Sequence, residues 1–268
     1  MERHGRGKGK KRLLGSHQKC WLWGRNLVLE TLLAGRWDVL DLFLAASLEE
    51  DVLADCRHMA DARGVPIRVE PPEYLERLCH TTEHQGFLAR MAEFPYAAEK
   101  ELLESLPAAS ASVLLDGVQD PYNFGAILRS AEVFGMNGIL IPAAGQVGVT
   151  SMVARSSVGA VNRIPIARVE SLETTAGLLR ARGVALVAAS EKGSAAIGEY
   201  DFRRSVAVII GNEGRGVSPG LLGLCDAVLR IPQKGRIGSL NASVAAGVFF
   251  YEVARQRGMG VGGGPAAS

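Results

Sequence analysis

The stretch from Asp116 to Ala131 contains polar side chains whose types and spacing could hold an anionic or polar ligand. Asn123 falls in the first turn of an expected helix, where unpaired backbone N–H groups attract negative charge. Gly125 and Arg129 are four residues apart and therefore share a face of that helix. A glycine one turn from an arginine leaves room for a ligand to approach the backbone while the guanidinium points at it. Taken alone, the stretch fits an ordinary strand-to-helix corner with a surface arginine equally well.

Two later stretches are glycine-rich loops that could also contact a ligand. The first, from Gly211 to Gly216, follows the apolar run Val206–Ile210, and its glycines can expose backbone N–H and C=O groups. The second runs from Ile231 to Ser243, where Ser239 or Asn241 can cap a following helix. The first is neither a dinucleotide fingerprint nor a Walker loop, because its spacing is G-x-x-G-x-G and no Gly-Lys-Ser/Thr follows. Each loop by itself is most simply a structural turn.

The elements that must position these loops alternate between apolar runs and helical segments. Strands are expected at Val113–Leu115, Gly138–Ile141, Arg163–Val169, Val184–Ala189, Val206–Ile210 and Ala227–Ile231. Helices are expected at Pro121–Phe134, Leu172–Ala181 and Asn241–Gln256, the first with Asp120 as its N-cap. Strands this apolar, interleaved with helices, predict a parallel sheet covered on both faces. Open sheets of this kind bind ligands where strands end and helices begin.

Residues 20–91 show a second, smaller alternation of the same kind. Asn26 precedes an apolar helix as a possible N-cap, and Gly35 ends that helix. Further elements are expected as a strand at Val39–Ala46, a helix at Leu48–Arg63, a strand at Pro66–Val69, a helix at Pro72–Cys79 and a strand at Gly86–Met91. This pattern predicts a small α/β/α layer domain. Residues 92–111, with two prolines, are typical of a linker, so the larger domain is expected at residues 112–258.

The formal net charge of +2 is unevenly distributed along the chain. Residues 1–19 carry seven lysines and arginines and one glutamate, which places +6 in this segment and leaves −4 for the remainder. The segment is rich in glycine and lacks apolar periodicity, so we expect a disordered tail. Such tails bind phosphate backbones without sequence preference, here through Arg6, Lys8, Lys10, Lys11 and Arg12. A solubilising role is the alternative. Residues 259–268 are expected to be flexible.

The composition narrows the class of protein. The chain has 268 residues, of which 47% are hydrophobic and 22% charged, so it can form one large or two modest domains, each with a buried core. No apolar run reaches the roughly 18 residues that span a bilayer, and the N-terminus lacks a signal-peptide segment. The four cysteines are scattered without a C-x-x-C pair, which is typical of reduced, mostly buried thiols in a cytosolic protein. We expect no membrane association and no metal site.

Taken together, the three stretches resemble the ordered motifs of the SpoU (TrmH-like) RNA ribose 2′-O-methyltransferases, within the knotted SPOUT class. The matching residues are Asp116, Asp120, Pro121, Asn123, Gly125, Arg129, Ser130 and Ala131, then Gly211 to Gly214, then Ile231, Pro232, Ser239, Leu240, Asn241, Ser243 and Ala245. The resemblance covers about residues 110–257. Gln233 departs from it, because the family usually has methionine there; this near-isosteric exchange bears on cofactor affinity more than on the class of reaction.

Residues 20–90 resemble the L30e-like substrate-binding domain found ahead of such catalytic domains. The resemblance begins at Trp23-Gly24-Arg25-Asn26 and includes Glu30. This layout is most similar to the 23S rRNA guanosine-2′-O-methyltransferase group. By resemblance, Arg25, Asn26 and Arg129 contact RNA.

The resemblance also implies an architecture and a cofactor. A trefoil knot forms in the C-terminal part of the sheet domain, and two copies of the chain pack as a homodimer through that domain. S-adenosylmethionine is the cofactor, bound by Gly211, Asn212, Gly214, Ile231, Gln233, Ser239, Leu240 and Asn241. The residues at the reacting groups are Arg129, Asn123, Glu213, Ser239 and Asn241.

Methyl transfer to a ribose hydroxyl requires that the hydroxyl lose its proton. All five histidines lie before residue 85, outside the expected catalytic domain. Family proposals give Arg129 the role of activating the hydroxyl, but a guanidinium stays protonated at neutral pH. Our hypothesis is that Arg129 lowers the pKa of the 2′-hydroxyl electrostatically and binds an adjacent phosphate, while Glu213 orients Arg129.

Two other functions compete with rRNA ribose methylation. The first keeps the enzyme and moves the substrate to tRNA; the added L30e-like domain argues against this, because that domain suits a structured rRNA loop. The second is a non-catalytic RNA-binding or ribosome-assembly factor on a decayed enzyme fold. The presence of Asn123, Arg129, Glu213, Ser239 and Asn241 argues against decay.

Overall fold

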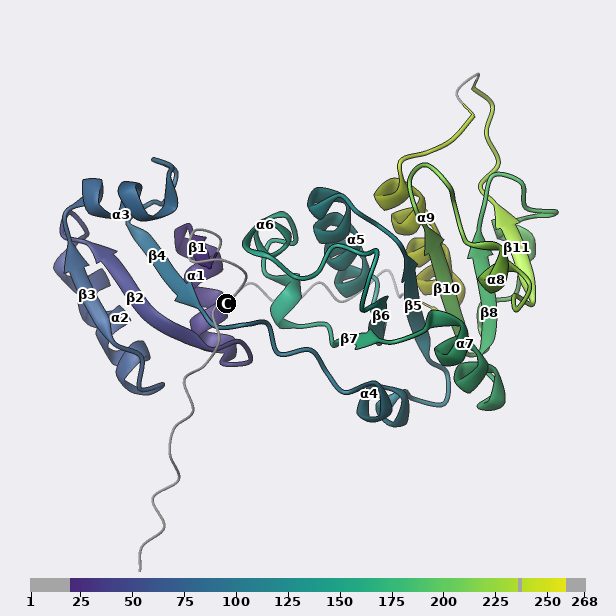
Figure 1. The fold of residues 1–268 in the computed structure, drawn as a ribbon, viewed down its shortest axis with the longest axis horizontal. Coiled ribbons are helices and arrows are strands. Elements are labelled where there is room, and N and C mark those ends of the chain that lie inside the picture. Colours follow the sequence, from purple (N-terminus) through teal and green to yellow (C-terminus); the bar gives the residue numbers. More distant parts are fainter. Residues whose placement is uncertain (1–19, 236–237, 259–268) are drawn as a thin grey trace, which may run out of the picture. The chain divides into compact units, whose positions relative to one another are not determined.

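The computed structural model describes residues 20–235 and 238–258 (Figure 1). The chain divides into two compact units, Met1–Pro95 and Tyr96–Ser268. The predicted basic tail, residues 1–19, and the predicted C-terminal tail, residues 259–268, lie outside the described residues. In the described part of the chain, no helix is long and apolar enough to cross a membrane.

The first unit is built on a four-stranded sheet. In spatial order its strands are β1 (Trp21–Trp23), β4 (Phe87–Met91), β2 (Val39–Ala45) and β3 (Ile67–Glu70). The helices are α1 (Arg25–Ala34), α2 (Glu50–Asp61) and α3 (Pro72–Cys79). Phe43 stacks on Tyr74 of α3, while Leu42 and Leu44, which point to the opposite face of β2, are fully buried. Both faces of the sheet are therefore covered, as the predicted α/β/α layering requires.

The start of α1 differs from the prediction. Gly24, at φ 99°, occupies the N-cap position, and Asn26 lies inside the helix instead of capping it. A backbone φ of this sign favours glycine, and the chain turns here so that the Arg25 N–H donates to Gln85 Oε1 at 2.9 Å. Gly35 ends the helix in the left-handed conformation, as predicted.

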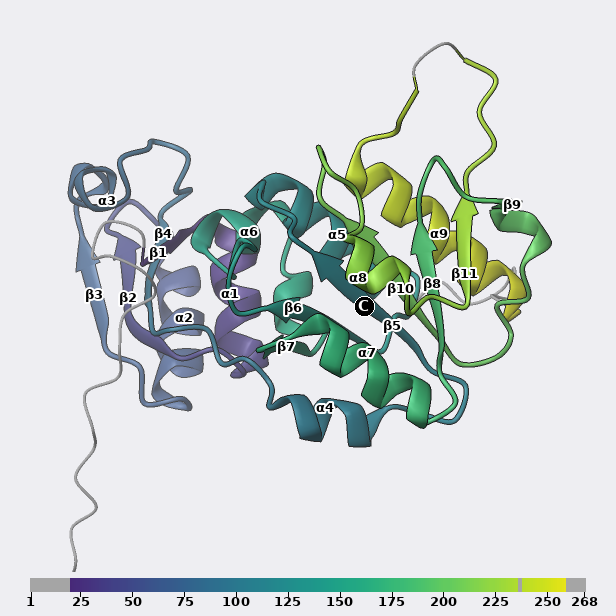
Figure 2. The same ribbon diagram turned by 45° about the vertical axis from the view of Figure 1, so that its right-hand side comes forward.

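The second unit is built on a seven-stranded sheet in which every pairing is parallel, as predicted. In spatial order its strands are β7 (Ile166–Val169), β6 (Gly138–Pro142), β5 (Ala111–Asp116), β10 (Val206–Gly211), β8 (Ala185–Ala189), β11 (Ala227–Arg230) and β9 (Ala195–Ala196). Strand β10 thus lies between β5 and β8, and β11 between β8 and β9 (Figure 2). Strands late in the sequence occupy places between earlier ones, which brings loops distant in sequence to one edge of the sheet.

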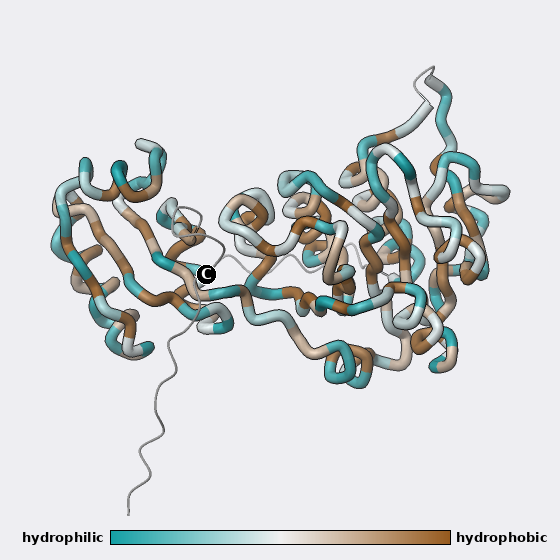
Figure 3. Tube along the Cα trace, in the orientation of Figure 1, coloured by the Kyte–Doolittle hydropathy of each residue, from teal (hydrophilic) through white to brown (hydrophobic). Residues whose placement is uncertain are grey.

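Helices cover both faces of this sheet (Figure 1). One face carries α5 (Pro121–Val133), α6 (Ser151–Ser156) and α9 (Ala242–Gln256), and the other carries α4 (Glu99–Ser105), α7 (Leu172–Ala181) and α8 (Pro219–Leu222). Single-turn 3-10 helices lie at Ala160–Asn162 and Ile197–Glu199. The hydrophobic residues concentrate along the strands between these layers (Figure 3).

The predicted linker contains a helix that belongs to the second unit. Leu102 and Leu103 of α4 are buried in the core that also contains Leu114 and Leu140 of the sheet. Burying two adjacent leucines removes their apolar surface from water, which offsets the cost of ordering the segment. The irregular part of residues 92–111 is therefore shorter than the composition predicts.

Arg257, directly after α9, fastens the end of that helix to the sheet. Its guanidinium donates to the backbone carbonyls of Phe202 at 2.9 Å, Ala109 at 2.6 Å, Ser110 at 2.9 Å and Arg204 at 2.7 Å. Burial lowers the pKa of Arg257, so desolvation opposes the charge while these carbonyls stabilise it.

Replacing Arg257 with lysine is expected to lower the free energy of unfolding by about 2 kcal/mol, because an ammonium group cannot reach all four carbonyls and several of these charge-assisted hydrogen bonds are lost. Urea denaturation measures this difference. Arg182→Lys, at an exposed position after α7, is the matched control and should stay within about 0.5 kcal/mol of the unchanged protein. Equal stability of the two variants would contradict the role assigned to Arg257.

Candidate functional site

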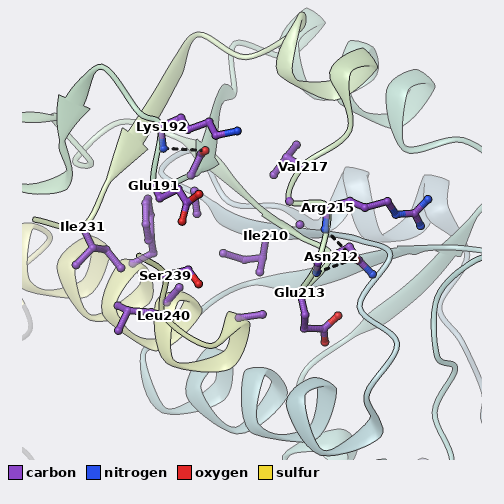
Figure 4. A pocket seen from close by; sticks show the side chains of 18 of the residues that line it. Glu191, Lys192, Ile210, Asn212, Glu213, Arg215, Val217, Ile231, Ser239 and Leu240 are labelled. Carbon is purple, nitrogen blue, oxygen red and sulfur yellow. Dashed lines mark hydrogen bonds between the residues drawn. The ribbon is translucent and has the colours of Figure 1, made fainter. Parts of the chain in front are cut away.

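A cavity of about 340 Å³ opens at the carboxyl ends of β8, β10 and β11 (Figure 4). It is lined by residues 189–192, residues 210–217, Leu222, Ile231, Gln233, Ser239, Leu240, Ala242, Ala245 and Phe249. Most of these residues come from the ends of the three strands and the loops that follow them, and the others come from α8 and the N-terminal half of α9. The cavity therefore lies at the strand ends where open α/β sheets bind ligands.

The loop after β10 is a tight turn held by Asn212. The Asn212 side chain accepts from the Gly214 N–H at 2.9 Å and donates to the Gly117 carbonyl oxygen at 2.7 Å. A Cβ atom on Gly211 would lie 2.1 Å from the carbonyl carbon of Gly216, so only glycine fits there. The glycines of this motif shape the cavity wall and fix the loop against the end of β5.

A chain of side-chain hydrogen bonds joins the three motifs. The Asn123 Nδ2 donates to Glu213 Oε1 at 3.0 Å, and the Asn241 Nδ2 donates to Asn123 Oδ1 at 3.0 Å. Asn241 Oδ1 in turn accepts from the Ser243 N–H at 2.9 Å and caps α9. The cap fixes the orientation of the Asn241 amide, because only its oxygen can face backbone N–H groups. Because the Asn241 Nδ2 then donates to Asn123 Oδ1, the orientation of the Asn123 amide is fixed as well, and its nitrogen faces Glu213.

The start of α5 is built as predicted, but Gly125 serves a different purpose. Asp120 caps the helix by accepting from the Tyr122 N–H at 2.9 Å. A Cβ atom on Gly125 would lie 1.9 Å from the Oγ of Ser156 on α6. The expectation that Gly125 leaves room for a ligand is therefore wrong. Helix α6, which the sequence analysis did not predict, fills that space, and Ser156 Oγ donates to the Pro121 carbonyl at 3.1 Å.

Arg129 lies outside the cavity lining, on the exposed side of α5. It shares that side with Tyr122, which is 61% exposed, and Val133, which is 60% exposed. Within residues 20–235 and 238–258, Arg129 forms no hydrogen bond or ion pair. The expected pairing with Glu213 is not seen, because Glu213 bonds to Asn123 instead. The Arg129 guanidinium is thus available to a group that comes from outside the chain.

Apart from Arg129, the predicted catalytic and cofactor-binding residues fall into two groups. Those that line the cavity are Gly211, Asn212, Glu213, Gly214, Ile231, Gln233, Ser239 and Leu240. Asn123 and Asn241 support the cavity through the hydrogen-bond chain. The sequence analysis missed residues Ser190, Glu191 and Lys192, which line the cavity directly after β8. Their position directly after the carboxyl end of an apolar strand could have indicated a ligand contact, but they belong to no recognisable motif.

In the first unit, Arg25 and Asn26 are exposed at the start of α1. The Arg25 guanidinium lies 5.9 Å from the centroid of the Phe87 ring, which restricts its direction. The other predicted RNA contacts, Arg6, Lys8, Lys10, Lys11 and Arg12, lie outside the described residues.

The four cysteines, all within the described residues, form no disulfide, and Cys20, Cys56 and Cys79 are buried, as predicted. Burial raises the pKa of Cys20 and Cys56, and it raises the pKa of Cys225 to about 11. These three thiols are protonated at neutral pH and do not act as nucleophiles. Among the described residues, no three His, Cys, Asp or Glu side chains are grouped so that they could hold a metal ion.

Comparison with known proteins gives matches over both units. The model of the SpoU rRNA Methylase family matches residues 110–251, and the model described as RNA 2′-O ribose methyltransferase substrate binding matches residues 21–97. The putative TrmH family tRNA/rRNA methyltransferase YacO of Bacillus subtilis is 34% identical over 245 residues, covering 90% of this chain and 98% of that protein. An uncharacterised tRNA/rRNA methyltransferase of Mycobacterium leprae is 36% identical over 87% of this chain and 76% of its own.

Solved structures of SpoU and TrmH methyltransferases are also similar to this chain. The SpoU methyltransferase AviRb from Streptomyces viridochromogenes, in complex with the cofactor AdoMet, has a TM-score of 0.76 and 26% identity over 90% of this chain and 91% of its own. The AdoMet-bound rRNA methyltransferase from Sinorhizobium meliloti has a TM-score of 0.77 and 27% identity over 89% and 87%. The TrmH/SpoU tRNA modifying enzyme of A. aeolicus has a TM-score of 0.51 and 29% identity over 59% of this chain and 80% of its own.

Proposed function

Because this chain belongs to the SpoU rRNA methylase family of RNA methyltransferases, we propose that it methylates the ribose 2′-hydroxyl of a guanosine in 23S rRNA. The observation that carries the proposal is the joining of three distant motifs around one cavity by the Glu213–Asn123–Asn241 hydrogen bonds. The guanosine and the 23S rRNA are supported by the resemblance of the two-domain layout to that enzyme group.

The cavity fits S-adenosylmethionine, the cofactor of this family. Its walls at Ile210, Ile231, Leu240 and Phe249 suit an adenine ring, and the backbone of the Gly211–Gly216 loop offers hydrogen-bonding groups. The lining carries ionisable side chains of both signs, Glu191 and Glu213 with Lys192 and Arg215, and such side chains can pair with the charged groups of a zwitterionic ligand. When bound, the cofactor supplies an electrophilic methyl group. Gln233 lines the same cavity, so its amide stands where the family usually has a thioether.

The protein contributes alignment and electrostatic stabilisation. The hydrogen-bond chain holds Glu213 and the start of α9 in fixed positions before the substrate arrives. Arg129, which has no partner in the described chain, binds the RNA phosphate and stabilises the negative charge that develops on the 2′-oxygen. Its guanidinium stays protonated throughout, so the hydroxyl proton passes to phosphate or water.

The first unit supplies the second half of the RNA interface in this proposal. The support is the match of residues 21–97 to the substrate-binding model, together with the exposure of Arg25 and Asn26. The rRNA methyltransferase of S. meliloti matches over 89% of this chain, whereas the tRNA modifying enzyme matches over 59%. The rRNA enzyme therefore matches a larger part of this chain than the tRNA enzyme does, which favours an rRNA substrate over tRNA. The names of the B. subtilis and M. leprae relatives mention both RNAs, so tRNA is the second candidate.

A direct experiment separates these substrates. The purified protein is incubated with methyl-labelled S-adenosylmethionine and either deproteinised 23S rRNA or total tRNA from a strain lacking the protein. The RNA is then digested to nucleosides for mass spectrometry. We expect 2′-O-methylguanosine from 23S rRNA alone. Label in tRNA alone would favour the second candidate, and saturable cofactor binding without label in either RNA would favour a non-catalytic RNA-binding factor.

We further infer that two copies of the chain pair through α5 and α9, and that the C-terminal part of the sheet domain is knotted as in the SPOUT class. The insertion of β10 between β5 and β8 supports the second point. The pairing of two copies is supported by exposed apolar residues on the adjacent helices α5 and α9. Val133, Val244 and Tyr251 are 60%, 51% and 48% exposed, and the rings of Phe134 and Tyr251 pack edge-on with their centroids 5.8 Å apart. Apolar residues grouped in this way mark an interface.

Replacing Tyr251 with glutamate is expected to shift the protein from dimer to monomer in sedimentation experiments, because a charge would be buried at the interface. Leu178→Glu provides the control, since Leu178 is 46% exposed on α7, on the other face of the sheet. Monomeric unchanged protein at micromolar concentration would contradict the pairing.

A further inference from the structure

Glu191 lines the cavity on the side opposite Glu213 and has no part in the methyl-transfer chemistry above (Figure 4). It follows β8, where the Ser190 Oγ accepts from the Lys192 N–H at 3.2 Å and turns the chain. The turn directs the two neighbouring side chains apart. In Figure 4 the Glu191 carboxylate faces the cavity between Ile231 and Ile210, and the Lys192 side chain, which also lines the cavity, runs in a different direction.

The Glu191 carboxylate is not engaged by the rest of the chain. Within the part that the structure describes, it forms no hydrogen bond or ion pair. The side chains drawn beside it, Ile231 and Ile210, offer no donor. An ionised carboxylate has several acceptor positions. Those of Glu191 are therefore free for donors of a bound ligand.

The position of Glu191 indicates which part of the ligand it meets. Glu213 is tied through Asn123 to α5, the helix that carries Arg129, so the reacting methyl group belongs at the Glu213 side of the cavity. The adenosine part then extends toward Ile231 and Leu240, on the side of Glu191. Adenosine offers a pair of neighbouring ribose hydroxyls there, and acidic side chains bind such a pair in other nucleotide sites.

We propose that Glu191 is a cofactor-specificity residue that accepts hydrogen bonds from the ribose 2′- and 3′-hydroxyls of the bound S-adenosylmethionine. The assignment rests on the proposed function, since it presumes that cofactor. It accounts for a carboxylate at the end of the cavity remote from the sulfonium.

The test compares three ligands by calorimetric titration of the full-length protein: S-adenosylmethionine, S-adenosylhomocysteine, and the 2′,3′-dideoxy analogue of S-adenosylhomocysteine. Glu191→Gln is expected to weaken the first two equally, by about tenfold, because a charge-assisted pair of hydrogen bonds is lost. The dideoxy analogue should bind the unchanged protein about tenfold more weakly than its parent and be insensitive to the substitution. Glu101→Gln, the same exchange at an exposed position of α4 outside the cavity lining, should leave all three affinities unchanged.

The outcomes distinguish this inference from the proposed function. A loss confined to S-adenosylmethionine, the ligand with the sulfonium charge, would overturn the ribose assignment in favour of a cation contact. Unchanged affinities in Glu191→Gln, or an equal loss for the dideoxy analogue, would overturn it as well. If the unchanged protein bound none of the three ligands, the proposed function would fail together with the inference. Equal thermal unfolding midpoints of the variants show that the differences are not due to misfolding.

Discussion

Replacing Arg129 with lysine is expected to lower the single-turnover rate of methyl transfer by about 100-fold or more, while the affinity for S-adenosylmethionine stays the same. A guanidinium presents several donors in a fixed plane and can contact a phosphate and the 2′-oxygen together, whereas an ammonium acts as a point charge. Arg129 lies outside the cavity lining, so cofactor binding does not depend on it. Because Arg129 is exposed, the substitution should leave the folding stability within about 0.5 kcal/mol of the unchanged protein.

The matched control is Arg182→Lys, which makes the same exchange at an exposed position beyond α7. Its turnover should equal that of the unchanged protein. If Arg129→Lys kept nearly full turnover with cofactor binding intact, Arg129 would not stabilise the transition state, and the α5 motif would need another role.

Replacing Asn123 with aspartate is expected to weaken cofactor binding by about 100-fold, measured as the Kd for S-adenosylhomocysteine. The substitution sets a second carboxylate where the Asn123 Nδ2 now donates to Glu213 at 3.0 Å. Like charges at this distance repel, and Glu213 would move together with the loop that forms the cavity wall. The link from Asn123 Oδ1 to Asn241 survives the substitution, because a carboxylate still accepts from that amide.

A paired substitution makes this prediction specific. Adding Glu213→Gln to Asn123→Asp reverses the direction of the same hydrogen bond and removes the second negative charge. Cofactor affinity should recover to within about tenfold of the unchanged protein, by the coupling that a double-mutant cycle measures. The rate of methyl transfer need not recover, because Glu213 lies at the side of the cavity where the reacting methyl group is expected. If the double variant bound the cofactor no better than Asn123→Asp alone, the hydrogen-bond chain would not be what shapes the cavity.

Much of the sheet could be predicted because its signals are local. The apolar strands β5, β6, β8 and β10 follow from short runs of buried residues, and the caps at Asp120 and Asn241 follow from side chains that accept from the first helical N–H groups. These features located the three loops that border the cavity. The prediction that these loops meet at one site rested on the family resemblance. Local signals cannot supply it, because the order of strands in a sheet depends on contacts distant in sequence.

The errors share a physical cause. Gly125 was interpreted from its own helix, yet the constraint on it comes from Ser156, a neighbour in space on a helix of only six residues. Glu213 was paired with Arg129 by residue type, whereas the geometry favours the Asn123 amide, whose orientation is inherited from the cap of α9. Glu191 lacked a motif, and the role that we propose for it depends on where the turn after β8 directs its carboxylate. Tertiary contacts decide each of these cases.

The most direct measurement is a map of 2′-O-methylated riboses in rRNA from cells with and without this protein, with complementation by the unchanged gene and by Arg129→Lys. The account predicts that one guanosine in 23S rRNA loses its 2′-O-methyl group when the protein is absent. The unchanged protein should restore this group, and the Arg129→Lys variant should restore little of it. An unchanged map of 2′-O-methylation in the absence of the protein would contradict the proposed rRNA substrate.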